Sequence, residues 1–192
     1  HKMMGRPVIT TALLFSDGAT SYNTFSQEAE YLLADTFEED WSNGANRTFE
    51  CTKLTSSLSW YAVLTHYGET IFEEYLDRQY DLARTFADLI RERAHWEVAC
   101  EPQSNILCFR WVPLGMPSAR LDKINENVRK KALEEGRFYI VQTRLKGTIY
   151  LRTSLMNPFT DKDHLSELLT YLETLGKASL ADEEALTETE IP

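Results

Sequence analysis

Lys2 and Arg152 are the two residues of this chain whose types could carry chemistry, although their local sequences alone favour ordinary solvated side chains. A lysine amine attacks an aldehyde only when it can be neutral, which requires desolvation or a nearby cation. Lys2 follows His1 and precedes a short apolar segment that begins at Pro7. A solvated lysine is compatible with the same local sequence, so both interpretations of Lys2 stay open at this point.

Arg152 lies in a stretch, residues 148–155, where apolar and polar residues alternate. The alternation predicts a strand with Ile149, Leu151 and Leu155 on the core face and Arg152 on the opposite face, near Tyr150. A guanidinium beside a phenol and a hydroxyl is well suited to binding a carboxylate through two hydrogen bonds. An exposed strand arginine is the alternative.

The remaining reactive residue types form no recognisable site. The histidines are isolated and lack metal-ligand spacing, so no metal site is predicted. Cys51, Cys100 and Cys108 form no C-x-x-C pair and are interpreted as reduced thiols. The sequence has no nucleophile elbow, no phosphate-binding loop and no dinucleotide-binding glycine motif.

Composition and charge exclude several classes of protein. The 192 residues are 43% hydrophobic and 26% charged, which is ordinary for a globular chain. The net charge of −10 is concentrated in residues 27–40 and 177–192, so there is no basic surface for nucleic acid or for an anionic membrane. No apolar run approaches the roughly 20 residues that cross a bilayer, and no signal peptide is recognised. We expect a cytoplasmic protein without nucleic-acid or membrane partners.

The elements that would position Lys2 begin with a buried strand predicted over residues 7–15. An exposed loop is predicted over residues 35–48, and a helix over about residues 54–66. A long amphipathic helix follows up to about residue 94, and the spacing of Thr70 and Glu73 predicts a capping box at its start.

A compact α+β unit is predicted around Arg152, over residues 95–176. The pattern predicts two strands, a helix closed by Gly136, a hairpin around Lys146 and Gly147, and a last helix capped by Thr160 and Asp163 and ended by Gly176. The expected ranges are 96–100, 106–111, 118–135, 138–144, 148–155 and 160–175. Residues 177–192 have no packing pattern and are expected to form a solvated acidic tail.

Several stretches, in order and spacing, resemble the group II amino-acid decarboxylases that depend on pyridoxal phosphate (PLP), the family of the glutamate, diaminobutyrate and aromatic amino-acid decarboxylases. The resemblance covers residues 1 to about 176. It rests on His1-Lys2-Met3-Met4-Gly5-x-Pro7, Glu30-Tyr31-Leu32-Leu33, Arg47-Thr48-Phe49-Glu50-Cys51-Thr52-Lys53, Tyr67-Gly68, Asn105-Ile106-x-Cys108-Phe109-Arg110 and Leu151-Arg152 followed by Asn157-Pro158.

The resemblance implies an α/β chain, the C-terminal part of a fold-type I PLP-dependent enzyme. Residues 1–68 would end the large PLP-binding domain and include a mobile loop, residues 69–94 would form a linking helix, and residues 95–176 a small C-terminal domain before the tail of residues 177–192. Lys2 would form the Schiff base with PLP, His1 would lie beside the cofactor phosphate, and Arg152 would bind the substrate carboxylate. The implied partners are an amino-acid substrate, a second copy in a homodimer and an upstream part of the same polypeptide.

One departure from the family pattern bears on the reaction. The family generally carries a catalytic tyrosine on the mobile loop before the cysteine segment, whereas this chain has Trp41-Ser42 there and no tyrosine from 32 to 59. Decarboxylation of an L-amino acid is the function that the resemblance implies. An oxidative decarboxylase or aminotransferase of the same fold, and a non-enzymatic α+β interaction module, are the alternatives.

Overall fold

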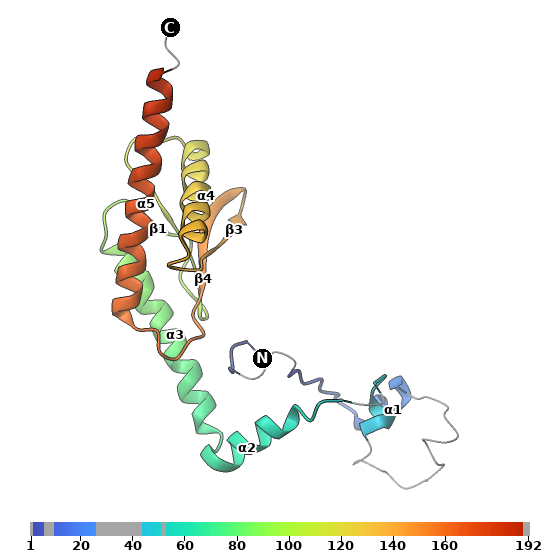
Figure 1. Cartoon of the computed structure of the whole chain (residues 1–192). Helices are drawn as coiled ribbons and strands as arrows, with labels where there is room; N and C mark the ends of the chain where they lie inside the picture. The colour runs from blue at the N-terminus through green and yellow to red at the C-terminus, as the bar shows by residue number, and fades with distance from the viewer. Residues whose placement is uncertain (1, 6–9, 26–43, 51–52, 190–192) are drawn as a thin grey trace. The chain divides into compact units, whose positions relative to one another are not determined.

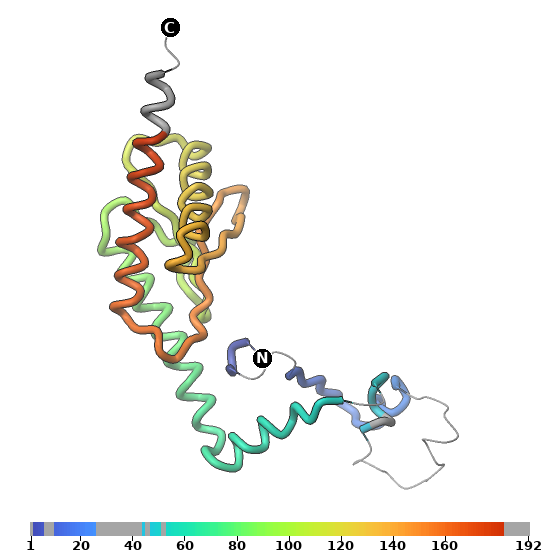
Figure 2. The backbone as a smooth tube through the Cα atoms, viewed as in Figure 1, coloured from blue at the N-terminus to red at the C-terminus, as the bar shows by residue number. Residues whose placement is uncertain are grey.

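The computed structural model describes residues 2–5, 10–25, 44–50 and 53–189. The chain divides into two units, His1–Gly68 and Glu69–Pro192. Figures 1 and 2 show the course of the chain through both units. His1 and most of the predicted mobile loop lie outside the described residues, so what was expected of them stays a prediction.

The described residues of the first unit form short helices and bury little apolar surface. Its described elements are α1 (Gly18–Phe25), the 3₁₀ helix η1 (Gly44–Arg47) and α2 (Ser57–Tyr67). The Arg47 guanidinium lies 4.2 Å from the centre of the Tyr22 ring, which joins η1 to α1. The helix predicted over about residues 54–66 is confirmed, because α2 occupies most of that range.

The buried strand expected over residues 7–15 is not observed in its described part. Residues 10–15 have no regular secondary structure, and the side chains of Leu13 and Leu14 are exposed. A strand needs neighbouring strands to pair its backbone N–H and C=O groups. No other strand occurs among the described residues of this unit, so the apolar run has no partner there.

The second unit is built on an antiparallel sheet of four strands. These are β1 (Trp96–Val98), β2 (Ile106–Trp111), β3 (Val141–Leu145) and β4 (Thr148–Ser154), arranged in the order β1-β2-β4-β3. β4 is therefore a central strand, and it pairs with β2 on one side and β3 on the other. The predicted strands are confirmed, although β3 begins three residues later than expected.

Three helices pack with this sheet to form one hydrophobic core. They are α3 (Thr70–Arg91), α4 (Ser118–Glu135) and α5 (Lys162–Thr189), and Figure 1 shows α4 and α5 alongside the strands. Phe109 of β2 is fully buried and meets Phe86 of α3 edge-on, with ring centres 5.1 Å apart. Leu151 of β4 belongs to the same buried cluster, so the alternation in β4 places the apolar residues inward as predicted.

The hairpin between β3 and β4 turns at Lys146 and Gly147, as the sequence predicts. Both residues have positive φ, 48° and 85°. Two consecutive residues in this conformation form the type I′ turn, whose twist matches that of paired strands. The tight turn sets the register in which Val141 lies opposite Arg152.

Three details of the helices differ from the sequence-based expectations. At α3 the predicted capping box does not form: the N-terminal cap is Glu69 rather than Thr70, and there is no capping hydrogen bond from a side chain. At α5 the capping residue is Asp161, whose carboxylate accepts the backbone N–H groups of Asp163 and His164, rather than Thr160. Gly176 does not end α5, because it is a close-packing position against Trp111 and the helix continues to Thr189.

The continuation of α5 overturns the expected tail in part. Ser179 is buried, and the Lys131 ammonium lies 2.7 Å from a carboxylate oxygen of Asp182. The segment after Gly176 thus packs on its own unit at least as far as Asp182. Among the described helices, none is long and apolar enough to cross a membrane.

Candidate functional site

Lys2 lies in a tight turn of the first unit. The Gly5 N–H donates to the Lys2 carbonyl at 3.1 Å, and Gly5 has a φ of 58°, which favours glycine. The Lys2 side chain is exposed, and its ammonium has no ion-pair partner among the described residues. The turn therefore leaves the Lys2 side chain at the surface of its unit, without a charged partner among the described residues.

Arg152 extends from the face of β4 that is turned away from the core. It lies opposite Cys108 of β2 and Val141 of β3. Burial raises the pKa of the Cys108 thiol, and the Arg152 charge acts in the opposite direction. The thiol beside the guanidinium is therefore neutral at physiological pH.

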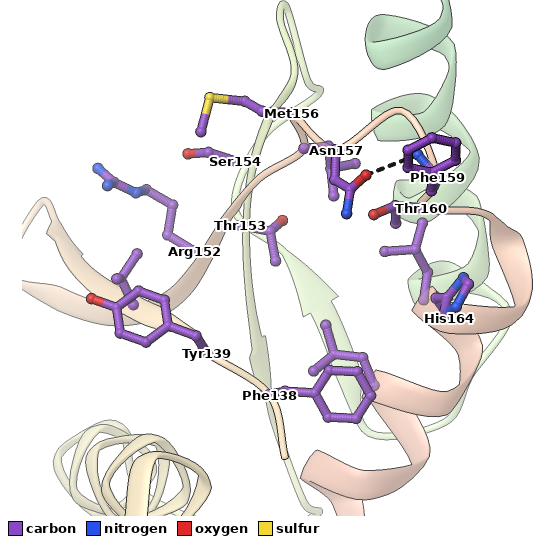
Figure 3. Close-up of a pocket in the computed structure, with 14 residues that line it drawn as sticks. Phe138, Tyr139, Arg152, Thr153, Ser154, Met156, Asn157, Phe159, Thr160 and His164 are labelled. Carbon is purple, nitrogen blue, oxygen red and sulfur yellow. Dashed lines mark hydrogen bonds between the residues drawn. The ribbon is translucent and has the colours of Figure 1, made fainter. Parts of the chain in front are cut away.

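A pocket of about 590 Å³ surrounds the end of β4 next to Arg152 (Figure 3). Its wall comes from the segment before β3, from β4 and from the segment that connects β4 to the start of α5. Half of the lining residues are apolar, namely Phe138, Val141, Leu155, Met156, Phe159, Leu165 and Leu168, and half are polar, namely Tyr139, Arg152, Thr153, Ser154, Asn157, Thr160 and His164. A concave pocket that combines apolar walls with polar groups is a candidate small-molecule site.

Arg152 and Thr153 each bring an unpaired polar atom to this wall. The Arg152 Nε and the Thr153 Oγ1 are shielded from water and have no hydrogen-bond partner among the described residues. Neither does the Arg152 guanidinium form an ion pair with any residue that the structure describes. An unpaired buried donor is costly, so this guanidinium is available for an anionic ligand.

The neighbouring arginine on the same face is already paired. Arg110 of β2 donates to the Glu97 carboxylate, which also accepts the Tyr150 hydroxyl at 3.1 Å. The Arg110 guanidinium lies 5.0 Å from the centre of the Tyr150 ring. Arg110 therefore pairs within the sheet, whereas Arg152, two residues beyond Tyr150, has no ion-pair partner among the described residues.

The segment after β4 is held in place by two contacts from other elements. Asn105, which is buried, accepts the Leu155 N–H through its backbone carbonyl and donates its side-chain amide to the Leu155 carbonyl, both at 2.9 Å. The Tyr75 hydroxyl of α3 donates to the Met156 carbonyl. These contacts fix the pocket wall where β4 ends, and they give Asn105, which occurs in one of the stretches singled out in the sequence, a structural role.

The structure locates the predicted site residues within separate units. Lys2 belongs to the first unit and Arg152 to the second, and His1 lies outside the described residues. The sequence analysis missed Tyr139, Thr153 and Asn105 as contributors to the pocket or its wall. The in–out alternation of residues 138–140 could have indicated Tyr139, but the pairing of Asn105 with Leu155 spans 50 residues and has no local signal.

Solved structures of amino-acid decarboxylases share this fold. The crystal structure of mouse CSAD superposes with a TM-score of 0.72 at 20% identity, covering 83% of this chain and 34% of that chain. The expected fold class, an α/β chain of the fold-type I PLP-dependent enzymes, is thus confirmed.

Curated relatives point to the same group. The chain is 28% identical over 170 residues to L-2,4-diaminobutyrate decarboxylase of Acinetobacter baumannii, which covers 88% of the chain and 33% of that protein. It is 26% identical over 129 residues to phenylacetaldehyde synthase of Arabidopsis thaliana, which covers 67% of the chain and 25% of that protein. The chain spans about a third of the length of the first curated relatives it matches.

Residues 1–112 match the pyridoxal-dependent decarboxylase conserved domain. The matched range includes Lys2 and its turn, α3, β1 and β2. It covers more than half of the chain, and the family resemblance seen in the sequence is confirmed. The chain belongs to the pyridoxal-dependent decarboxylase family.

Proposed function

We propose that this chain is part of a PLP-dependent carboxy-lyase that decarboxylates an L-amino acid to the amine and CO2. The observation that carries the proposal is Arg152, an arginine without a partner among the described residues, on the wall of a pocket in a chain of this family. A substrate carboxylate satisfies both the charge and the planar geometry of its guanidinium.

The residues of the first unit are compatible with PLP. We propose Lys2 as the catalytic and cofactor-binding residue, whose amine would hold the cofactor through its aldehyde, with His1 beside the cofactor phosphate. When bound, PLP would supply an electron sink for the charge that remains on the substrate as CO2 leaves. Arg152 would orient the carboxylate so that its bond to the α-carbon is the one that breaks.

The domain assignment belongs to the same proposal. Residues 1–68 would complete a large PLP-binding domain supplied by an upstream part of the same polypeptide, residues 69–94 would link it to a small domain of residues 95–176, and an acidic segment of residues 177–192 would follow. We further propose a cytoplasmic homodimer, which sedimentation of the complete enzyme would distinguish from a monomer.

Kinetics of two variants of the complete enzyme test the proposal. Lys2→Ala should abolish turnover and the visible absorbance that borohydride discharges. Arg152→Lys keeps the charge but loses the planar fork, so KM should rise about tenfold while the PLP dissociation constant stays unchanged. Retention of the absorbance in Lys2→Ala would remove Lys2 from this role, and an unchanged KM in Arg152→Lys would contradict the carboxylate contact.

An oxidative decarboxylation to an aldehyde is the second candidate. It is favoured by the absence of tyrosine from 32 to 59, where the family carries its loop tyrosine, and by the similarity to a phenylacetaldehyde synthase. Product analysis in the presence of dioxygen separates the two, because both release CO2. Decarboxylation leaves an amine, whereas the second candidate consumes O2 and water and leaves an aldehyde, ammonia and hydrogen peroxide.

A further inference from the structure

Tyr139 is a large aromatic residue whose position on the pocket wall is set by its neighbours. Phe138 packs against the Tyr171 ring with centres 5.5 Å apart, and Ile140 is only 2% exposed. With both neighbours held in the core, the backbone directs Tyr139 outward, and its side chain is 83% exposed although it lines the pocket.

Tyr139 lies just before β3 and lines the same pocket as Arg152. Val141, the first residue of β3, is the cross-strand partner of Arg152, and Tyr139 precedes it by two residues. Figure 3 shows the Tyr139 ring and the Arg152 side chain extending to the same side of the pocket. The Tyr139 hydroxyl has no hydrogen-bond partner among the residues that the structure describes.

We propose that Tyr139 is a substrate-binding residue: its hydroxyl donates a hydrogen bond to the carboxylate that Arg152 binds, and its ring covers the carbon chain of the amino acid. The inference rests on the proposed function, because it takes the Arg152 ligand to be a substrate carboxylate. Toward an ionised carboxylate, a phenol and a guanidinium both act as hydrogen-bond donors. The two groups can therefore donate to the same carboxylate without competing with each other. The exposed ring supplies apolar contact at low conformational cost, since it has only two side-chain torsions.

Steady-state kinetics of Tyr139→Phe in the complete enzyme is the direct test, with L-2,4-diaminobutyrate, L-aspartate and L-tyrosine as the trial substrates. Loss of a hydrogen bond to a charged group should raise KM about tenfold and leave kcat within about twofold. Tyr139→Ala should raise KM further, because it also removes the ring. Leu114→Ala is the matched control, since Leu114 is 84% exposed in the same unit and lies outside the pocket.

A second readout avoids the chemistry of turnover. Butyrate and 3-phenylpropionate lack the amine that reacts with the cofactor, so their inhibition constants report contacts to the carboxylate and carbon chain alone. These constants should rise about tenfold in Tyr139→Phe and in Arg152→Lys, and stay unchanged in Leu114→Ala. Unchanged KM and inhibition constants in Tyr139→Phe, with both raised in Arg152→Lys, would overturn the role of Tyr139 and leave the proposed function standing. Unchanged values in both variants would overturn the carboxylate contact of Arg152 and the role of Tyr139 together, whereas absence of turnover in the unmodified enzyme would contradict the proposed function.

Discussion

Asn105 lies outside the pocket, yet its side chain holds part of the pocket wall. It is 3% exposed, and its amide nitrogen donates to the Leu155 carbonyl at 2.9 Å. Asn105→Asp replaces this donor by an acceptor and buries a charge. The free energy of unfolding should fall by at least about 2 kcal/mol, because the Leu155 carbonyl is left unpaired and the carboxylate unsolvated. Urea unfolding followed by circular dichroism measures it.

Asn157→Ala is the matched control for Asn105. The Asn157 side chain accepts the Phe159 N–H at 2.9 Å but is exposed, so water replaces the lost bond and the expected change is below about 1 kcal/mol. Equal losses in the two variants would show that the buried amide has no special role.

At the residue scale, sequence reasoning succeeded where a signal is local. The alternation of β4 predicted that Arg152 leaves the core, and the structure agrees because Ile149 and Leu151 are buried on the other face. That the Arg152 Nε has no hydrogen-bond partner among the described residues could not be predicted, because this depends on which side chains of β2 and β3 lie next to it.

At the scale of elements, Gly176 was predicted to end the last helix, but α5 continues through it. A Cβ built at Gly176 would lie 2.4 Å and 2.6 Å from ring carbons of Trp111. Gly176→Ala should therefore destabilise the protein by about 1–3 kcal/mol through overpacking, although alanine favours a helix by about 1 kcal/mol. Thermal or urea unfolding of the variant measures the balance.

Ala178→Gly, on the same helix, is the control for Gly176→Ala. Because Ala178 is exposed, this variant reports helix propensity alone, and the free energy of unfolding should fall by about 1 kcal/mol. If Gly176→Ala stabilises the protein instead, the contact with Trp111 does not limit how closely α5 packs against that ring.

Helices and strands of the second unit were largely predictable, because their apolar periods are long and their turns carry glycine. Gly136 closes α4 with a φ of 70°, as a C-terminal glycine commonly does. Gly176 resembles the same signal, but its reason is a tertiary contact with a residue 65 positions earlier. A glycine that ends a helix and a glycine that lets a ring approach it look alike in sequence.

At the scale of the whole molecule, nearly all the apolar burial among the described residues belongs to the second unit. Its core cluster runs from Ala83 to Leu175, whereas the buried residues described in the first unit are Thr10 and Ser21. Residues 69–192 expressed alone should unfold in one cooperative transition, with coincident urea curves from circular dichroism and tryptophan fluorescence.

The same urea unfolding experiment on residues 1–68 expressed alone is the comparison. This fragment should show no cooperative unfolding transition, because its described residues bury too little apolar surface to offset the entropy lost when the chain folds. Separate midpoints for the two probes in residues 69–192 would contradict the prediction of a single folding unit. The strand expected over residues 7–15 is not observed in its described part, residues 10–15, for a related reason: an apolar run predicts burial, but a buried strand requires partner strands.

The pocket wall is drawn entirely from residues 138–168, so it is contained in the second unit. On the proposed function, mutations at the end of β4 would alter substrate contacts while the lysine segment, more than 130 residues away in sequence, stays as it is. Such a separation would let selection change which substrate is bound without changing the residue proposed to hold the cofactor.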